Sequence, residues 1–192
     1  MASALAGRIA PTSAAAHQVV LNIVGLIFMV PFGFASAAAV RVGHAIGRGD
    51  HPGARRAGWA AIALATCAMF GSASLFALAP RWLIGFFTHD AGVIDLGVGL
   101  LLVAAVFQLF DGVQAVATGA LRGLGNTHIA MVVNLVSHWM LGLPVAYLLC
   151  FHYGFGVQGL WMGLAFGLIF AGSVLLVVWH RDSRAIVEPA GA

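Results

Sequence analysis

The sequence contains very little charge. Only 8% of its 192 residues are Asp, Glu, Lys or Arg, lysine is absent, and Asp and Glu together number six. Soluble domains carry about 25% charged residues, so this composition excludes a chain with an ordinary water-exposed surface. The hydrophobic share of 61% and the mean hydropathy of +1.00 instead predict a protein of the lipid bilayer.

Several functional signatures are also missing. There is no G-x-S-x-G nucleophile motif, no P-loop and no pair of neighbouring carboxylates, and the eight His residues show no metal-ligand spacing. The two cysteines, Cys67 and Cys150, are expected to be buried small hydrophobes rather than a disulfide or redox pair. The chain is therefore predicted not to be an enzyme and to hold neither a metal nor a cofactor.

Two further patterns have ordinary explanations. The segment GFGVQG at 154–159 fits G-x-G-x-x-G, but it joins two apolar stretches and is predicted to be a tight turn between helices. The net charge of +3 comes from nine Arg scattered among the ends of the apolar stretches, without a basic cluster interleaved with aromatic residues. We therefore expect no nucleic acid partner.

Five apolar stretches are long enough to cross a bilayer, which needs about 20 apolar residues per helix. They cover residues 19–40, 59–79, 93–118, 129–151 and 157–179. None alternates apolar and polar residues as a barrel strand does, so the expected fold is an all-α, polytopic membrane helix bundle. The bundle would occupy residues 17–182, between a lead-in at 1–16 and a cytoplasmic tail at 183–192.

The distribution of Arg predicts the orientation of this bundle. The first loop, the third loop and the C-terminal segment hold Arg41, Arg48, Arg55, Arg56, Arg122, Arg181 and Arg184, whereas only Arg8 and Arg81 fall on the other side. By the positive-inside rule these loops and the C-terminus are cytoplasmic, and the N-terminus is outside. An N-terminus outside requires a signal or a preceding span. A cleaved signal with its apolar core at 19–34 would reverse the charge bias, so we favour a missing N-terminal portion.

A single carboxylate, Asp111, lies inside the apolar stretch VAAVFQLFDGVQAVATGALRG at 103–123. On a helix it shares one polar stripe with Gln108, Gln114 and Thr118. A charge at the middle of a membrane costs about 3 kcal/mol on insertion scales, so the stripe is expected to face protein or water. Because low-dielectric surroundings disfavour the ionised form of a carboxylate, Asp111 is predicted to exchange a proton or to bind a cation. The alternative is a structural role, as a hydrogen-bonded acid or as a partner of His138.

A second polar patch follows in the next stretch, where Asn134 and His138 are close in sequence. A lone His in such a helix often only completes a hydrogen bond, and this alternative stays open. Pro31 and Pro144 are expected to kink their helices. The residues predicted to line one cavity with Asp111 are Phe107, Gln108, Gln114, Thr118, Asn134 and His138.

Several segments together resemble the MATE (multidrug and toxic compound extrusion) transporters. AAAHQVVLNIVGLIFMVPFGFASAAAVRVGHAIGRGD is similar to the A-A-H-Q, P-x-G and R-V-G-x-x-x-G-x-G-D pattern of the second half of that family. FQLFDGVQAVATGALRGLGNT resembles its F-Q-x-x-D-x-x-Q and G-x-L-R-G-x-G-x-T segment, and SHWMLGLPVAYLL and GVQGLWMGLAFGL resemble its last two helices. The resemblance runs from about residue 14 to residue 179.

The resemblance implies a place in a larger architecture. Family members have twelve helices in two six-helix lobes with both termini cytoplasmic. The five spans would then be helices eight to twelve, most of one lobe, with residues 1–16 the end of a truncated helix seven. This implication agrees with the orientation derived from Arg and presents the chain as a fragment.

The resemblance also implies a function. The family exports cationic or amphipathic organic compounds in exchange for sodium ions or protons, and Asp111 matches its acidic residue in helix ten. Two departures from NorM-type members stand out: Phe107 replaces a Tyr that they can have, and the acidic residue of their helix seven is lacking. Since sodium needs several oxygen ligands, coupling to protons is favoured over sodium. The expected partners are organic cations, membrane lipid and a missing N-terminal lobe, in the bacterial inner membrane.

Two rival interpretations remain. Alternating access requires two moving halves, so the chain alone could be a truncated, non-transporting or partner-dependent half. The related lipid-linked oligosaccharide flippases share the architecture, but they are expected to have an Arg-rich central cavity, which these spans lack.

Overall fold

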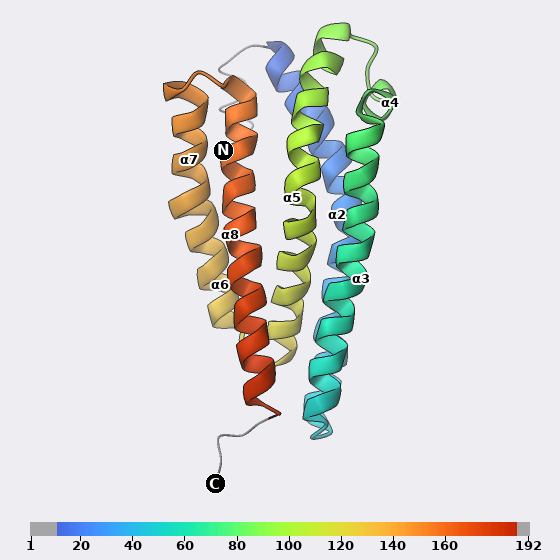
Figure 1. The fold of residues 1–192 in the computed structure, drawn as a ribbon, viewed down its shortest axis with the longest axis vertical. Helices are drawn as coiled ribbons and strands as arrows, with labels where there is room; N and C mark the ends of the chain where they lie inside the picture. The colour runs from blue at the N-terminus through green and yellow to red at the C-terminus, as the bar shows by residue number, and fades with distance from the viewer. Residues whose placement is uncertain (1–10, 188–192) are drawn as a thin grey trace.

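The computed structural model describes residues 11–187, and these fold into an all-helical bundle (Figure 1). The elements are α2 (Pro11–Gly47), α3 (His51–Leu78), α4 (Pro80–Gly85), α5 (Ala91–Gly123), α6 (Thr127–Leu135), η1 (Val136–Gly142), α7 (Leu143–Tyr147), η2 (Leu148–His152) and α8 (Gly156–Ala185). The part of the chain between residues 11 and 187 contains no strand, so the predicted fold class is confirmed.

Within the described residues, five helical segments are long and apolar enough to cross a membrane: α2, α3, α5, the continuous run from α6 to η2, and α8. Four of them enclose a predicted span and extend beyond it at both ends, and α3 begins eight residues before the predicted span 59–79 and ends at Leu78, one residue short of it. Residues 1–10 of the predicted lead-in lie outside the described part, and from residue 11 onward the chain is already in α2. At the other end α8 runs to Ala185, inside the predicted tail, whose last five residues, 188–192, are outside the described part.

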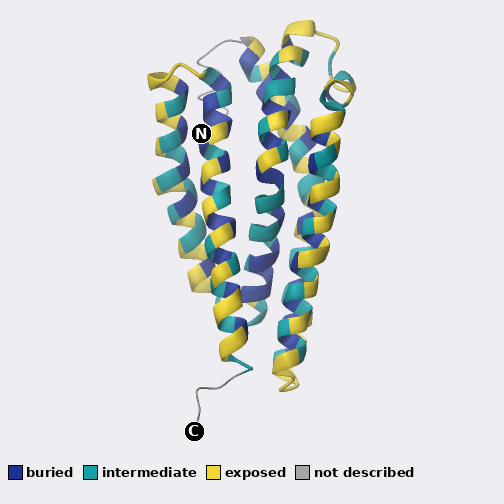
Figure 2. Cartoon of the chain, viewed as in Figure 1, coloured by how far each residue is buried: buried dark blue, intermediate teal, exposed yellow. Residues whose placement is uncertain are grey.

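Helix α5 lies at the centre of the bundle, packed against α2, α3 and α8. Figure 2 shows it mostly in the buried and intermediate colours, while α3 and α6 carry more exposed surface. Two apolar clusters surround it: one contains Leu100 and Phe107 near one end of the bundle, and the other contains Val116 and Trp179 near the opposite end. The middle of α5 therefore has three helices around it, although one face stays open, where Val106 is 61% exposed.

Glycines let α5 and α2 approach closely. A Cβ added at Gly119 would lie 2.2 Å from the backbone oxygen of Ala35, and one at Gly123 would lie 2.7 Å from that of Ala39. The two glycines and the two alanines are each four positions apart, one helical turn, so they meet in register. Small residues with this spacing drive helix association in membranes, where packing replaces the hydrophobic effect.

Helix α8 meets the α6–η2 run through a second glycine stripe, Gly159, Gly163 and Gly167. A Cβ at Gly163 would lie 2.2 Å from the backbone of Ala146, and one at Gly167 would lie 2.8 Å from the carbonyl oxygen of Ser137. The fourth and fifth spans are therefore held at backbone contact along their length.

The fourth span is not a uniform α-helix. The amide of Leu143 donates to the carbonyl of His138, and that of Tyr153 donates to Leu148, each five residues back, which defines π turns around the short segment that contains Pro144. Proline has no amide hydrogen to donate, and the wider turns accommodate this defect. The structure thus places a π segment on each side of the short helix with Pro144, and the kinks expected at Pro31 and Pro144 stay predictions.

The connections alternate between the two ends of the bundle. The α2–α3 and α5–α6 turns and the end of α8 lie at the lower end in Figure 1, and α4 with the η2–α8 turn lies at the upper end. The first two residues of the G-x-G-x-x-G segment lie in that upper turn and the other four begin α8, and φ is positive at Gly154 and Gly156, which confirms a turn between two helices. All Arg residues of the described part except Arg81 are at the lower end.

The cysteine prediction is half right. Both cysteines are free, and Cys150 is buried, but Cys67 is exposed on α3. Sequence hydropathy cannot distinguish the lipid-facing side of a membrane helix from its buried side, because both are apolar.

Candidate functional site

The carboxylate of Asp111 lies half-buried on the central helix α5. Among the described residues Asp111 takes part in no hydrogen bond or ion pair, and their one ion pair joins Arg81 to Asp95 at the upper end. The other acidic residues of residues 11–187 are near helix ends, where Asp50 and Asp90 cap α3 and α5. Asp111 is therefore the one acidic residue among residues 11–187 that lies in the middle of a membrane span.

The neighbours of Asp111 in sequence fix the direction of its face. Gly112 packs on Met69 of α3, and the carbonyl of Phe110 meets Gly172 of α8 on the other side. Because successive helical residues turn by about 100°, Asp111 points between these two contacts. The helices that flank this direction are α2, reached through Gly119, and α6, reached through Gln114.

Gln114 joins α5 to α6 by a hydrogen bond from its Nε2 to Oδ1 of Asn134. Asn134 in turn donates from Nδ2 to the carbonyl of Ala130 at 2.9 Å, and its own carbonyl lies 2.9 Å from Nδ1 of His138. The second oxygen of the pair, Oε1 of Gln114, is buried without a hydrogen-bond partner among the described residues. The sequence-predicted Gln114, Asn134 and His138 are therefore brought together.

A cavity of about 310 Å³ opens one turn below this pair, between α5 and α6. Thr118 and Asn134, both predicted from sequence, line it together with Arg122, Thr127, Ala130 and Met131. Its hydroxyl, amide and guanidinium groups give it a polar character unusual for a membrane helix interface.

Phe107 lies about one helical turn above Asp111 on α5, toward the upper end of the bundle, whereas Gln114 lies below it. Its ring is 4% exposed and stacks on Trp161 of α8, with centroids 5.8 Å apart. The indole Nε1 of Trp161 donates to Nδ1 of His17 on α2 at 3.0 Å. These three rings link α5, α8 and α2 one turn above Asp111.

Gln108 behaves differently from the rest of the predicted stripe. Its side chain is completely buried, and neither Nε2 nor Oε1 has a partner among the described residues. Asp111, Gln114 and Thr118 remain half-buried together. The reason is helical geometry: Gln108 and Gln114 are turned by about 60° to opposite sides of Asp111, and the side of Gln108 is toward α2.

Sequence reasoning missed three residues of this region: His17, Trp161 and Arg122. His17 and Arg122 both belong to family-like motifs, A-A-H-Q and G-x-L-R-G, so a signal was present. Trp161 carried no local signal, because its contacts depend on how α8 packs. Among residues 11–187 no group of three or more His, Cys, Asp or Glu is placed to hold a metal ion.

Known proteins match this chain over nearly its whole length. A family model described as MatE matches residues 1–148. The chain is 44% identical over 191 residues to the Brucella suis biovar 1 protein named "Probable multidrug resistance protein NorM", and 43% identical over 191 residues to the "Multidrug resistance protein NorM" of Burkholderia vietnamiensis. These alignments cover 97% and 95% of this chain and 41% of each relative, so the chain spans about two-fifths of their length.

Solved structures of transporters have the same fold. The eukaryotic MATE transporter AtDTX14 matches with a TM-score of 0.82 and 25% identity, over 94% of this chain and 42% of that one. The MATE transporter ClbM in complex with Rb+ matches with a TM-score of 0.86 and 22% identity, over 98% of this chain and 44% of that one. The matched share of each is the size of one lobe. Since the family model covers most of the sequence, the chain belongs to the MatE family, as its motifs predict.

Proposed function

We propose that this chain forms the ion-coupled lobe of an exporter of organic cations and drugs. The observation that carries the proposal is Asp111, an acid within a span that has no hydrogen bond or ion pair among the described residues. A carboxylate there is costly to insert, and a structural role would require a fixed partner. The similarity to proteins named as multidrug resistance proteins supports the same reading.

The mechanism follows from linkage. An ion can shift a conformational equilibrium only by its difference in affinity for the two states. Protonation of Asp111 removes the charge from the α5 face between α2 and α6, and deprotonation restores it. An organic cation is held in the state in which Asp111 is charged, and proton uptake from outside favours its release.

We favour protons over sodium as the coupling ion. Sodium needs several oxygen ligands at once, and Phe107, one turn from Asp111, offers none. The carboxamide oxygen of Asn134 already accepts from Gln114, which leaves Oε1 of Gln114 as the one carboxamide oxygen of this pair without a hydrogen bond among the described residues, too few for a sodium site. No other cofactor is required by this scheme.

The Arg-rich lower end supports an inner-membrane orientation with the C-terminus in the cytoplasm and residue 11 near the outer surface. Alternating access needs two moving halves, and the chain spans about 41% of its curated relatives. The alternative function is therefore a membrane half that transports only together with a second lobe, which supplies the other wall of the substrate path.

The test uses the complete natural polypeptide that carries this sequence, reconstituted in liposomes that hold a fluorescent organic cation. Asp111→Asn should abolish export driven by either a proton or a sodium gradient, and Asp111→Glu should retain part of it. Asp95→Asn is the matched control, because Asp95 is exposed at the upper end. Export by Asp111→Asn at the parental rate rejects the role, and export driven by sodium alone rejects proton coupling.

A further inference from the structure

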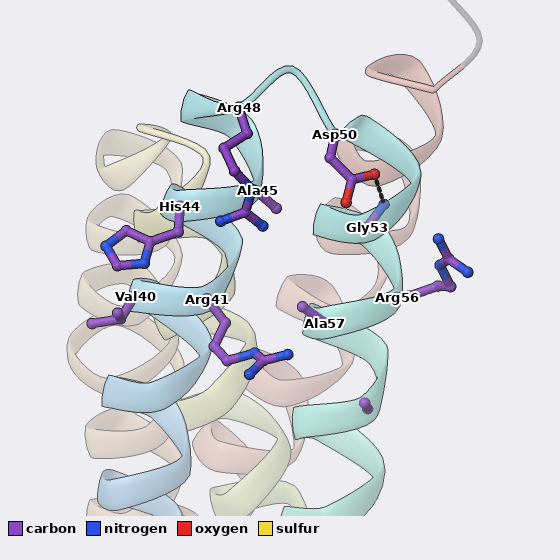
Figure 3. A pocket seen from close by; sticks show the side chains of 10 residues that line it. Val40, Arg41, His44, Ala45, Arg48, Asp50, Gly53, Arg56 and Ala57 are labelled. Carbon is purple, nitrogen blue, oxygen red and sulfur yellow. Dashed lines mark hydrogen bonds between the residues drawn. The ribbon is translucent and has the colours of Figure 1, made fainter.

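A basic cavity lies at the lower end of the bundle, between the last turns of α2 and the first turns of α3. Its volume is about 510 Å³, and its charged lining residues are Arg41, Arg48, Asp50 and Arg56. Arg41 and Arg48 are seven positions apart on α2, two helical turns, so they share one face. Figure 3 shows both side chains reaching into the space between the helices, whereas Arg56 points away from α2 at the edge.

Among the described residues, no carboxylate forms an ion pair with the arginines of this cavity. The only ion pair in the part of the chain that the structure describes is Arg81–Asp95, at the opposite end. Asp50 is the one acidic group of the wall, and its Oδ1 accepts from the amide of Gly53 at 2.8 Å, the cap of α3. The guanidinium groups of Arg41 and Arg48 are thus available, and their planar forks of donors fit phosphate oxygens.

An apolar groove continues from the basic cavity along α2 and α3 toward the middle of the bundle. This second cavity has a volume of about 330 Å³ and shares Arg41, Ala57 and Ala60 with the first. Beyond them it is walled by apolar residues, with Phe34 and Leu64 at its far end. Most of the residues that line it are alanines, and their small side chains leave space between the two helices.

We propose that this crevice binds one anionic phospholipid, with its phosphate between Arg41 and Arg48 and an acyl chain in the groove. A free phosphate would not account for the apolar groove, and an apolar ligand would not account for two guanidinium groups that form no ion pair with any residue between 11 and 187. A phospholipid has both parts in the right order, with the polar group at the membrane surface. Basic pockets between transmembrane helices are a recognised form of lipid headgroup site.

The site is separate from Asp111 and independent of the proposed export. The Arg-rich end and the groove face the same leaflet whichever way the bundle is oriented, so the inference does not depend on the orientation. Its failure would leave the role of Asp111 untouched, because the two tests measure different quantities.

The test measures how much spin-labelled phosphatidylglycerol the complete natural polypeptide immobilises in phosphatidylcholine nanodiscs. Arg41→Gln with Arg48→Gln should weaken the binding about tenfold or more, since each basic residue near an anionic surface contributes measurably. Arg181→Gln with Arg184→Gln removes the same charge at the same end, outside the crevice, and should leave it unchanged. Arg41→Lys with Arg48→Lys keeps the charge but removes the planar forks of donors, and should bind at a level between the parent and the Gln pair. Equal losses in the two Gln pairs, or no loss in either, overturn the proposal.

A second pair of variants tests the groove without changing charge. Ala37 lines only the groove, and Ala63 is exposed on α3 outside it. Ala37→Leu should reduce phosphatidylglycerol binding severalfold, and Ala63→Leu should not. If Ala37→Leu binds lipid like the parent and inorganic phosphate displaces the label, the site takes phosphate alone and the lipid proposal is wrong.

A photoreactive amino acid at position 37 identifies the occupant directly. Irradiation in native membranes should yield an adduct with the mass of a phospholipid. An adduct with another segment of polypeptide would show that protein covers the groove, and would overturn the proposal.

Discussion

The side chain of Gln114 on α5 donates a hydrogen bond to the side chain of Asn134 on α6, close to Asp111. This bond connects the central helix to the span that contains both π segments. It joins the helix that bears the carboxylate to the span with the π segments. Its loss should therefore lower both the stability of the bundle and the rate of transport.

A double-mutant cycle measures this bond. Gln114→Leu and Asn134→Leu should each lower the melting temperature in detergent, and the double variant should lose less than their sum. The expected coupling energy is about 0.6 to 1 kcal/mol, the usual range for side-chain hydrogen bonds between membrane helices. Strictly additive losses would mean that the two amides do not interact.

Gln108 and Gln114 should respond in opposite ways to one substitution. Gln108→Met replaces a buried amide that has no described partner by a chain of similar volume, and should raise the free energy of unfolding by about 1 kcal/mol. Gln114→Met breaks the bond to Asn134 and should lower it. Melting temperatures of the two variants check this prediction. A loss of stability in Gln108→Met would indicate that Gln108 has a partner outside the described residues.

The contact of Gly119 with the backbone of Ala35 is expected to tolerate no added methyl group. Gly119→Ala places a Cβ 2.2 Å from the backbone oxygen of Ala35, so α2 must shift. We expect a destabilisation of about 1–3 kcal/mol, as for other overpacked sites. Gly71→Ala on α3 is the matched control because nothing lies within 4 Å of its added Cβ. Equal melting temperatures for both variants would contradict the contact.

Trp161 should stabilise the upper end through its indole nitrogen as well as through its ring. Trp161→Phe keeps an aromatic ring beside Phe107 but removes the donor to His17. We expect a loss of about 1 kcal/mol in stability, measured by thermal unfolding. Trp82→Phe, at an exposed position on α4, should have little effect. If the two substitutions cost the same, the hydrogen bond to His17 contributes nothing.

The five spans could be predicted because a bilayer imposes a length and an apolar composition on every helix that crosses it. Asp111 could be identified from sequence because an acidic residue inside a long apolar stretch is unusual. The separate position of Gln108 could not, since periodicity gives an angle around one helix but not where the neighbouring helices lie. The stacking of Phe107 on Trp161 joins residues far apart in sequence and needed the packed bundle. The roles of Asp111 and of the lining residues remain predictions.

The π turns of the fourth span have a consequence for its register. Conversion of η1 to α-helical geometry would rotate every residue beyond it by about 100° and advance it by about 1.5 Å along the helix axis. Val145 would then take the position of Ala146 opposite Gly163, and its branched side chain is larger than the methyl group that now lies at this backbone contact. The contact at Gly163 therefore depends on the wider turn of η1. Ala146 lies against Gly163 only while that turn contains one residue more than an α-helical turn.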